Sequence, residues 1–178
     1  MATTTTMSPD KPSRRDFLYV ATGAAGAVGA ATSLVPLISQ MNPDASTIAA
    51  AAPVEIDLAP IAEGQIVKVF WRSKPIFIFH RSQKEIDEAG KINWHDLPDP
   101  EPDSARTKPG HDQWLVVIGI CTHLGCIPLP HQGDYDGWFC PCHGSQYDTA
   151  GRIRRGPAPK NLYLPPYEFL SDSKIRIG

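Results

Sequence analysis

Hydrophobic residues form one continuous stretch near the N-terminus and an alternating pattern in the rest of the chain. The stretch from Phe17 to Pro43 has 27 residues and contains no acid or base. A helix of that length crosses a bilayer core of about 30 Å even when it is tilted. We therefore predict one transmembrane helix over residues 17–41, and we expect Pro36 to bend it near its end.

Beyond residue 53, apolar positions alternate with polar ones at the period of β-strands. The run QWLVVIGI at 113–120 is the most apolar of these segments and predicts a buried strand. One short helix is expected at 82–89, and an irregular excursion rich in Pro and Asp at 90–111. This pattern predicts a mostly antiparallel β domain over residues 54–178. Its other expected strands lie around the second motif described below and at 54–58, 65–71, 75–80, 161–164, 167–170 and 174–177.

The segment before the predicted transmembrane helix resembles an export signal. Residues 1–16 contain the pair Arg14-Arg15, with Phe17-Leu18 directly after it, as in twin-arginine signals. No Lys or Arg follows the apolar run until Lys68, so we expect residues 1–16 on the cytoplasmic side. A cleaved signal peptide is the alternative, but the run is longer than the 7–15 residues of an ordinary signal core.

Residues 42–53, NPDASTIAAAAP, are small and show no pattern that would build a core. Such a composition predicts a flexible linker between the anchor and the β domain. Alternatively, the signal peptide is removed, and the alanines at 49–52 then provide the cleavage site.

The composition narrows the classes of partner. The 178 residues carry a net charge of −2, and 42% of them are hydrophobic, which suits one ordinary domain with an appendage. Lys and Arg are scattered among acids and form no basic stripe, so nothing indicates a nucleic-acid partner. The 18 prolines and 14 glycines indicate a domain rich in loops.

All four cysteines and two of the six histidines lie in two short motifs, CTHLGC at 121–126 and CPCHGSQYD at 140–148. Cys121 and His123 are two positions apart, and Cys140 and His143 are three apart. Two loops that face each other could bind a metal through thiolate and imidazole, which suits zinc or iron–sulfur chemistry. A disulfide framework would explain the cysteines but not the histidines, and a zinc site of four cysteines would leave the histidines without a role.

The two motifs, C-x-H-x-G-C and C-P-C-H-G-S-x-Y-D, closely resemble those of the Rieske iron–sulfur family, whose 2Fe-2S cluster has two histidine ligands. With the export anchor, the linker, QWLVVIGICTHLGC and the GPAP run at 156–159, the chain is similar to the Rieske subunits of bacterial ubiquinol–cytochrome c reductases. The resemblance covers nearly the whole chain. It implies a Rieske-type β domain with a small cluster-binding subdomain at 121–148, after one N-terminal transmembrane helix.

The resemblance also implies a role for each residue of the motifs. One iron would be bound by the thiolates of Cys121 and Cys140, and the other by ring nitrogens of His123 and His143. The loops would be joined by a disulfide between Cys126 and Cys142. The family pattern further implies hydrogen bonds to the cluster sulfurs, from the hydroxyl of Ser145 to a bridging sulfur and from the phenol of Tyr147 to the sulfur of Cys121. Such bonds stabilise the reduced state and raise the reduction potential.

Quinol oxidation is the activity that the resemblance implies. His143 would meet ubiquinol and accept its proton, while the cluster takes an electron and passes it to a c-type cytochrome. Leu124 would belong to an apolar tip that contacts cytochrome b. Pro157 and Pro159 would stiffen a loop over the cluster. The expected setting is a dimeric complex in the bacterial inner membrane, with this chain as a single-pass subunit whose β domain lies in the periplasm.

Three other kinds of Rieske protein and one protein of a different class, a structural zinc module, are the alternatives. A Rieske ferredoxin of a ring-hydroxylating oxygenase would lack the second cysteine pair and the anchor. The small subunit of a periplasmic arsenite oxidase shares both motifs, but Ser145 with Tyr147 favours the quinol enzyme. The plastoquinol-oxidising relatives share them too, and the segment 81–111 argues against these. A structural zinc module would contain no iron.

The remaining histidines have no partnered spacing and are expected at the surface or in loops: His80, His95, His111 and His131.

Overall fold

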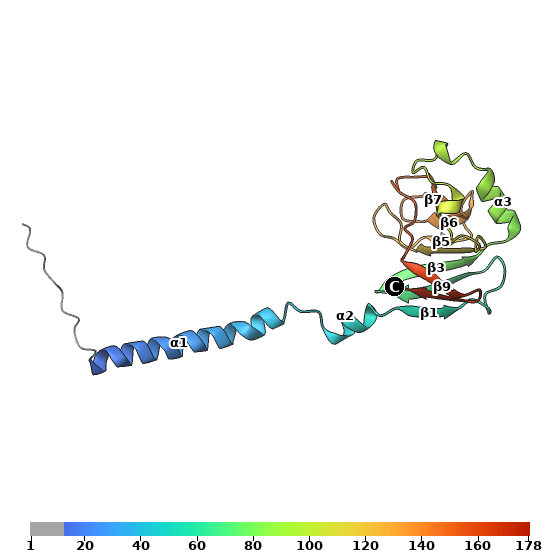
Figure 1. Cartoon of the computed structure of the whole chain (residues 1–178). Helices are drawn as coiled ribbons and strands as arrows, with labels where there is room; N and C mark the ends of the chain where they lie inside the picture. Colours follow the sequence, from blue (N-terminus) through green and yellow to red (C-terminus); the bar gives the residue numbers. More distant parts are fainter. Residues whose placement is uncertain (1–12) are drawn as a thin grey trace, which may run out of the picture. The chain divides into compact units, whose positions relative to one another are not determined.

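The computed structural model describes residues 13–178 as two units, which divide between Ala45 and Ser46 (Figure 1). Residues 1–12, most of the predicted cytoplasmic segment, lie outside the described residues. The first unit contains helix α1 (Arg14–Ser39), and the second, which we call the head, contains ten strands and two α-helices among the described residues.

Helix α1 begins three residues before the predicted span because Ser13 caps it. The Ser13 hydroxyl accepts a hydrogen bond from the Asp16 N–H, and the Asp16 carboxylate accepts one from the Ser13 N–H. At 1.5 Å per residue, its 26 residues reach about 39 Å, and its apolar composition suits a membrane span. The helix continues past Pro36, so the proline does not end it.

The segment 42–53 differs from the expectation of a linker without regular structure. A short helix, α2 (Ala45–Ala50), occupies its middle. Alanine has the highest helix propensity of all residues, which explains a turn of helix here. Six residues are too few for a helix that is stable without tertiary packing, so α2 gives the segment little stiffness of its own.

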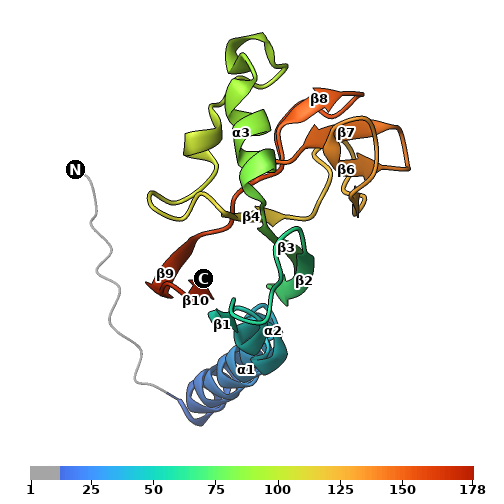
Figure 2. The ribbon, with the colours of Figure 1, turned by 90° about the vertical axis from the view of Figure 1, so that its right-hand side faces the viewer.

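Two three-stranded antiparallel sheets form the part of the head that lies away from the motifs (Figure 2). One has the order β1-β10-β9 and the other β2-β3-β4. Trp71, Ile76, Trp114 and Ile175 belong to the buried core that these sheets share. The strands are β1 (Val54–Asp57), β2 (Ile66–Trp71), β3 (Lys74–His80), β4 (Trp114–Ile118), β9 (Tyr167–Ser171) and β10 (Lys174–Ile177).

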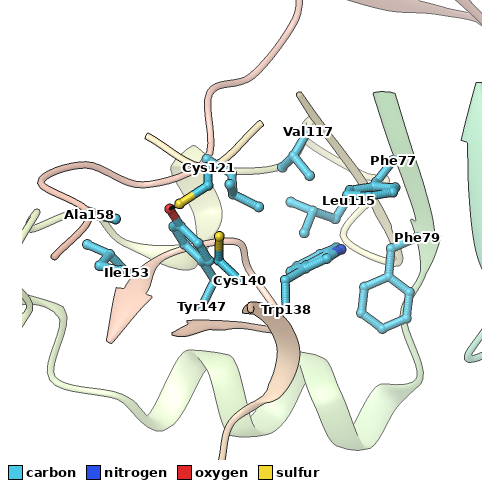
Figure 3. Close-up of a cluster of buried hydrophobic side chains, with 11 residues drawn as sticks. Phe77, Phe79, Leu115, Val117, Cys121, Trp138, Cys140, Tyr147, Ile153 and Ala158 are labelled. Carbon is cyan, nitrogen blue, oxygen red and sulfur yellow. Dashed lines mark hydrogen bonds between the residues drawn. The ribbon is translucent and has the colours of Figure 1, made fainter. Parts of the chain in front are cut away.

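A four-stranded antiparallel sheet at the other end of the head carries the second cysteine motif, and the first motif lies in the loop that leads from β4 into this sheet (Figures 1 and 2). Its order is β5-β6-β7-β8. A second core lies under it, where Trp138 stacks on Phe77 and meets Phe79 edge to face (Figure 3). Cys121, Cys140 and Tyr147 are part of the same core. The strands are β5 (Leu129–Pro130), β6 (Asp136–Cys140), β7 (Ser145–Asp148) and β8 (Ile153–Arg155).

The excursion between β3 and β4 begins with helix α3 (Gln83–Lys91), whose N-terminus has a capping box of Ser82 and Glu85. Two single 3₁₀ turns follow, η1 (Trp94–Asp96) and η2 (Asp103–Ala105). The fully buried Arg81 binds the Asp103 carboxylate at 2.6 Å and the Asp112 carbonyl, which ties the excursion to the strands.

The predicted strand at 161–164 is wrong, because its backbone bonds to several different segments and to no single strand. The Leu162 N–H donates to the Gly151 carbonyl, while the Tyr163 carbonyl accepts from the Ile118 N–H.

His80 also differs from the expectation of a surface or loop residue. It lies in β3, where its ring stacks on Trp114 and its Nδ1 lies 2.8 Å from the Ile61 carbonyl oxygen.

Gly137 provides a test of the sheet that carries the motifs. A Cβ at this position would overlap the Asp148 carbonyl, at an irregularity in the β6–β7 pairing. Gly137→Ala should lower the free energy of unfolding by about 2 kcal/mol, in the range of overpacked cores. Gly90→Ala is the matched control, because a Cβ there meets nothing and alanine favours the helix. Thermal unfolding of the full chain compares them, and equal melting temperatures would contradict this close approach.

Candidate metal centre

The first motif forms a closed turn directly after β4. The Cys121 N–H donates to the Cys126 carbonyl at 2.8 Å, and the Gly125 N–H donates to the Cys121 carbonyl at 3.0 Å. Gly125 has φ +83°, which few other residues adopt without strain. The turn buries the Cys121 thiol and leaves the Leu124 side chain 70% exposed.

The second motif is the hairpin between β6 and β7. Cys140 pairs with Ser145 in the sheet register, and the Gly144 N–H donates to the Cys140 carbonyl at 2.9 Å. Gly144 closes this turn with φ +76°. Ser145 and Tyr147 are two positions apart on β7, so their side chains point to the same face of the strand.

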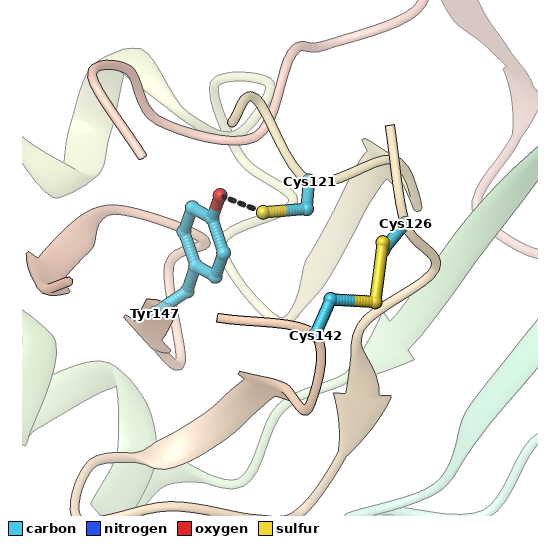
Figure 4. The surroundings of a disulfide bond; sticks show 4 residues. All are labelled: Cys121, Cys126, Cys142 and Tyr147. Atoms are coloured by element: carbon cyan, nitrogen blue, oxygen red, sulfur yellow. Dashed lines mark hydrogen bonds between the residues drawn. A yellow bond between two sulfur atoms is a disulfide. The ribbon is translucent and has the colours of Figure 1, made fainter. Parts of the chain in front are cut away.

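The four cysteines divide into two free thiols and one disulfide. Cys121 and Cys140 are free and only 2% exposed, whereas Cys126 and Cys142 are bonded to each other across the two loops (Figure 4). The sulfurs of Cys126, Cys140 and Cys142 lie within 4.8 Å of one another. Because two of these form the disulfide and carry no thiolate, we do not regard this triplet as a ligand set. The thiols available to a metal are Cys121 and Cys140.

The two histidines of the motifs meet beside these thiols. The ring centroids of His123 and His143 are 4.6 Å apart with an interplanar angle of 87°. Nδ1 of His123 is buried, and within residues 13–178 it has no hydrogen-bond partner. Such an orphaned nitrogen costs free energy unless it binds something, and a metal is one way to satisfy it. His143 is exposed.

The Cys121 sulfur is surrounded by hydrogen-bond donors. The Tyr147 hydroxyl donates to Sγ at 3.3 Å, as Figure 4 shows, and itself accepts the Thr122 N–H at 3.2 Å. Burial acts to raise the pKa of the Cys121 thiol, but donors led by Tyr147 outweigh it and lower the pKa below the usual value. They include the His123 N–H and the Ser145 hydroxyl. Donors that favour the thiolate suit a metal ligand.

Ser145 is fully buried, and its oxygen accepts the Ala158 N–H at 3.1 Å. This bond leaves the hydroxyl proton free to point toward the sulfurs. Burial raises the pKa of the Cys140 thiol, which the neighbouring Cys121 raises further.

Sequence reasoning missed Thr122 and Ala158, although both lie inside or beside the motifs. The Thr122 hydroxyl donates to the Lys160 carbonyl at 2.6 Å. The Ala158 N–H donates to the Ser145 oxygen. The only signal in the sequence was their position. Thr122 lies between two proposed ligands, and Ala158 lies between two prolines.

All eight predicted site residues therefore gather where the two loops face each other. Two buried thiols, two imidazoles and two hydroxyl donors form a mixed sulfur and nitrogen set, and it fits a 2Fe-2S cluster with two histidine ligands. Four thiolates would be needed for an ordinary cluster, and the disulfide excludes that arrangement here.

Comparison with known proteins agrees with this donor set. Residues 56–168, well over half of the chain, match the model of the Rieske 2Fe-2S domain. A chain from Bradyrhizobium diazoefficiens named ubiquinol-cytochrome c reductase iron-sulfur subunit is 71% identical over 98% of this chain and 99% of its own length. The chain belongs to this family. Its cofactor is one Rieske 2Fe-2S cluster, as the motifs predicted.

Three further comparisons concern the N-terminal segment, a second relative and a solved structure. Residues 4–44 match the Ubiquitinol-cytochrome C reductase Fe-S subunit TAT signal, in line with the predicted twin-arginine signal. A second iron-sulfur subunit, from Blastochloris viridis, is 66% identical over 93% of this chain and 92% of its own. A solved structure titled hyperthermophilic respiratory Complex III aligns with a TM-score of 0.53 and 28% identity, over 88% of this chain and 98% of the other. The predicted family and the mostly antiparallel β fold are confirmed.

The disulfide gives a first prediction for the site. Cys126→Ser should destabilise the loops by about 3 kcal/mol, a typical value for a crosslink that closes a loop of this length. The rate of iron loss on warming should rise accordingly. The double variant with Cys142→Ser should behave like either single variant, because each alone removes the same bond. Peptide mapping without reductant checks the premise, and two free thiols in the wild-type protein would refute the bond.

The hydroxyl donors give a second prediction. Tyr147→Phe and Ser145→Ala each remove a hydrogen bond that favours the reduced state. A bond to a charged group contributes about 1.5–3 kcal/mol, so each variant should lower the midpoint potential by roughly 65–130 mV. Tyr135→Phe is the control, because the Tyr135 ring packs on Arg154, away from the sulfurs. Redox titration followed by EPR measures the potentials, and unchanged values in both variants would contradict the assigned donors.

Proposed function

We propose that this chain is the electron-transfer subunit of a membrane-bound quinol–cytochrome c reductase and oxidises ubiquinol. The observation that carries the proposal is the contrast within the site. The thiols of Cys121 and Cys140 are buried and hydrogen-bonded, while His143 is exposed next to them. An electron can be held inside the protein while a proton is exchanged at its surface.

The proposed ligands are Cys121 and Cys140 for one iron and His123 and His143 for the other. A Rieske cluster supplies a one-electron acceptor whose potential is raised by neutral imidazole ligands. The chain contributes buried positions that keep water from the thiols of Cys121 and Cys140, and the donors Ser145 and Tyr147 that favour the reduced form.

His143 is the proposed contact with the quinol. Its ring nitrogen that is not bound to iron can accept a hydrogen bond from a quinol hydroxyl and then take its proton. Imidazole suits this role because a ring nitrogen can accept a hydrogen bond and can also hold a proton. Loss of the proton from the hydroxyl makes removal of the quinol electron easier, so the two transfers are coupled in one contact.

An apolar surface beside the histidines is the proposed contact with cytochrome b. Leu124, Ile127 and Leu129 are 70%, 46% and 39% exposed, although each is a large hydrophobic side chain. Large hydrophobic side chains that are exposed close together in one segment of a water-facing domain are typical of a docking site. Docking there would exclude water from the quinol between the two proteins.

The anchor and linker complete the proposal. With Arg14 and Arg15 on the cytoplasmic side, α1 would hold the head in the periplasm. The segment 42–53 would act as a hinge, which lets the head reach cytochrome b and a membrane-bound c-type cytochrome in turn. We further propose that the complex is a dimer, as in the family that the motifs resemble.

Purification of the native complex through a tag on this chain tests the function. We expect haems of b and c type in the product, and reduction of cytochrome c that depends on ubiquinol. A Cys121→Ser chain should assemble without the iron–sulfur EPR signal and without this activity. A product with molybdenum and no b-type haem would instead indicate a periplasmic oxidase such as arsenite oxidase.

A further inference from the structure

A carboxylate from the excursion between β3 and β4 is bonded to the loop that covers the cysteines. We call residues 156–161, GPAPKN, the cover loop. Asp99 Oδ2 accepts the backbone N–H of Asn161 at 2.9 Å, and Oδ1 accepts the Lys160 ammonium at 2.9 Å. The Asp99 backbone carbonyl also accepts from Nδ2 of Asn161 at 3.2 Å. About 60 residues of chain separate Asp99 from the residues that it binds.

The cover loop in turn contacts the donors that surround the sulfurs. The Ala158 N–H binds the Ser145 oxygen, which sets where that hydroxyl proton can point. The Lys160 carbonyl accepts from the Thr122 hydroxyl, and the Thr122 N–H binds the Tyr147 oxygen. Both hydroxyl donors therefore depend on the position of the cover loop.

We infer that Asp99 is a positioning residue that latches the cover loop and thereby sets the reduction potential of the site. It acts through Lys160 and Asn161. The part of the inference that concerns potential rests on the proposed function and ligand set. The latch itself is a statement about this chain's own hydrogen bonds.

The backbone bond is the more important half of the latch. The Lys160 side chain is 57% exposed, and an ion pair in that setting contributes little because solvent screens it. Asn161 is 3% exposed, so its N–H has no water to replace a lost acceptor. Burial acts to raise the pKa of Asp99, but the Asn161 and Lys160 bonds outweigh it and lower the pKa, which keeps both oxygens available as acceptors at neutral pH.

Asp99→Ala, which removes both acceptor oxygens, tests the inference, with Lys160→Met and Asp96→Ala as companions. Asp96 lies in the same excursion and accepts a bond from Asn93, so its variant removes the same charge without touching the cover loop. Removal of a negative charge alone would raise the potential. Loss of the latch should lower it, because the donors to the reduced site are loosened. The two effects have opposite signs.

Hydrogen–deuterium exchange of peptides spanning 156–164 in the full-length protein measures the latch directly. In Asp99→Ala we expect the exchange to be at least ~10-fold faster, with a smaller increase in Lys160→Met and none in Asp96→Ala. The equilibrium between oxidised and reduced protein should shift about threefold toward the oxidised form in Asp99→Ala. This corresponds to a fall of about 30 mV.

Three results would overturn the inference. Unchanged exchange in Asp99→Ala would show that the carboxylate does not hold the loop. Faster exchange with an unchanged or higher potential would show that Asp99 has a structural role only. Equal effects in Asp96→Ala would show that they come from the lost charge. Exchange needs no iron, so an error in the proposed ligand set would appear separately, as an iron–sulfur EPR signal that survives in Cys121→Ser protein.

Discussion

The register between β6 and β7 is the constraint on which the rest of the site depends. Cys140 pairs with Ser145, and Trp138 pairs with Tyr147. Because side chains alternate along a strand, this register turns Ser145 and Tyr147 toward the sulfurs together. A slip of β7 by one residue would turn both hydroxyls away from the sulfurs and move the buried Tyr147 ring to the other face of the sheet.

Buried charges stabilise the turns that support this register. Asp148, directly after Tyr147, accepts from the Arg152 N–H and Nε at 3.0 and 2.9 Å. Both side chains are almost completely buried, and Arg152 also binds the Ala89 carbonyl. A buried pair is costly to assemble and far costlier to break, so it specifies one geometry more than it adds stability. Arg106 acts similarly between the carbonyls of Ala150 and Leu162.

The site combines a rigid interior with an exposed edge. Two glycine turns and a disulfide fix the loops, so the buried thiols and their donors have little freedom to rearrange when charge changes. The edge presents His143 and Leu124 to solvent. In the proposed function, tuning of the potential and contact with partners would thus be handled by different side chains. A change of partner surface can leave the buried hydrogen bonds intact.

The sequence by itself predicted the long apolar helix, most strands and the residues that gather at the site. Alternation located β1, β2, β9 and β10, whereas β3 and β4 are almost continuously apolar because both of their faces are buried. The paired motifs pointed to the cysteines and histidines. Only the tertiary structure decided which hydrogen bonds residues 161–164 and Asp99 make. Their partners are distant in the chain, as in the Asn161 to Asp99 bond and the Tyr163 carbonyl that meets Ile118. Local periodicity reports which face of a segment is buried, but it carries no information about which distant residue satisfies a buried polar group.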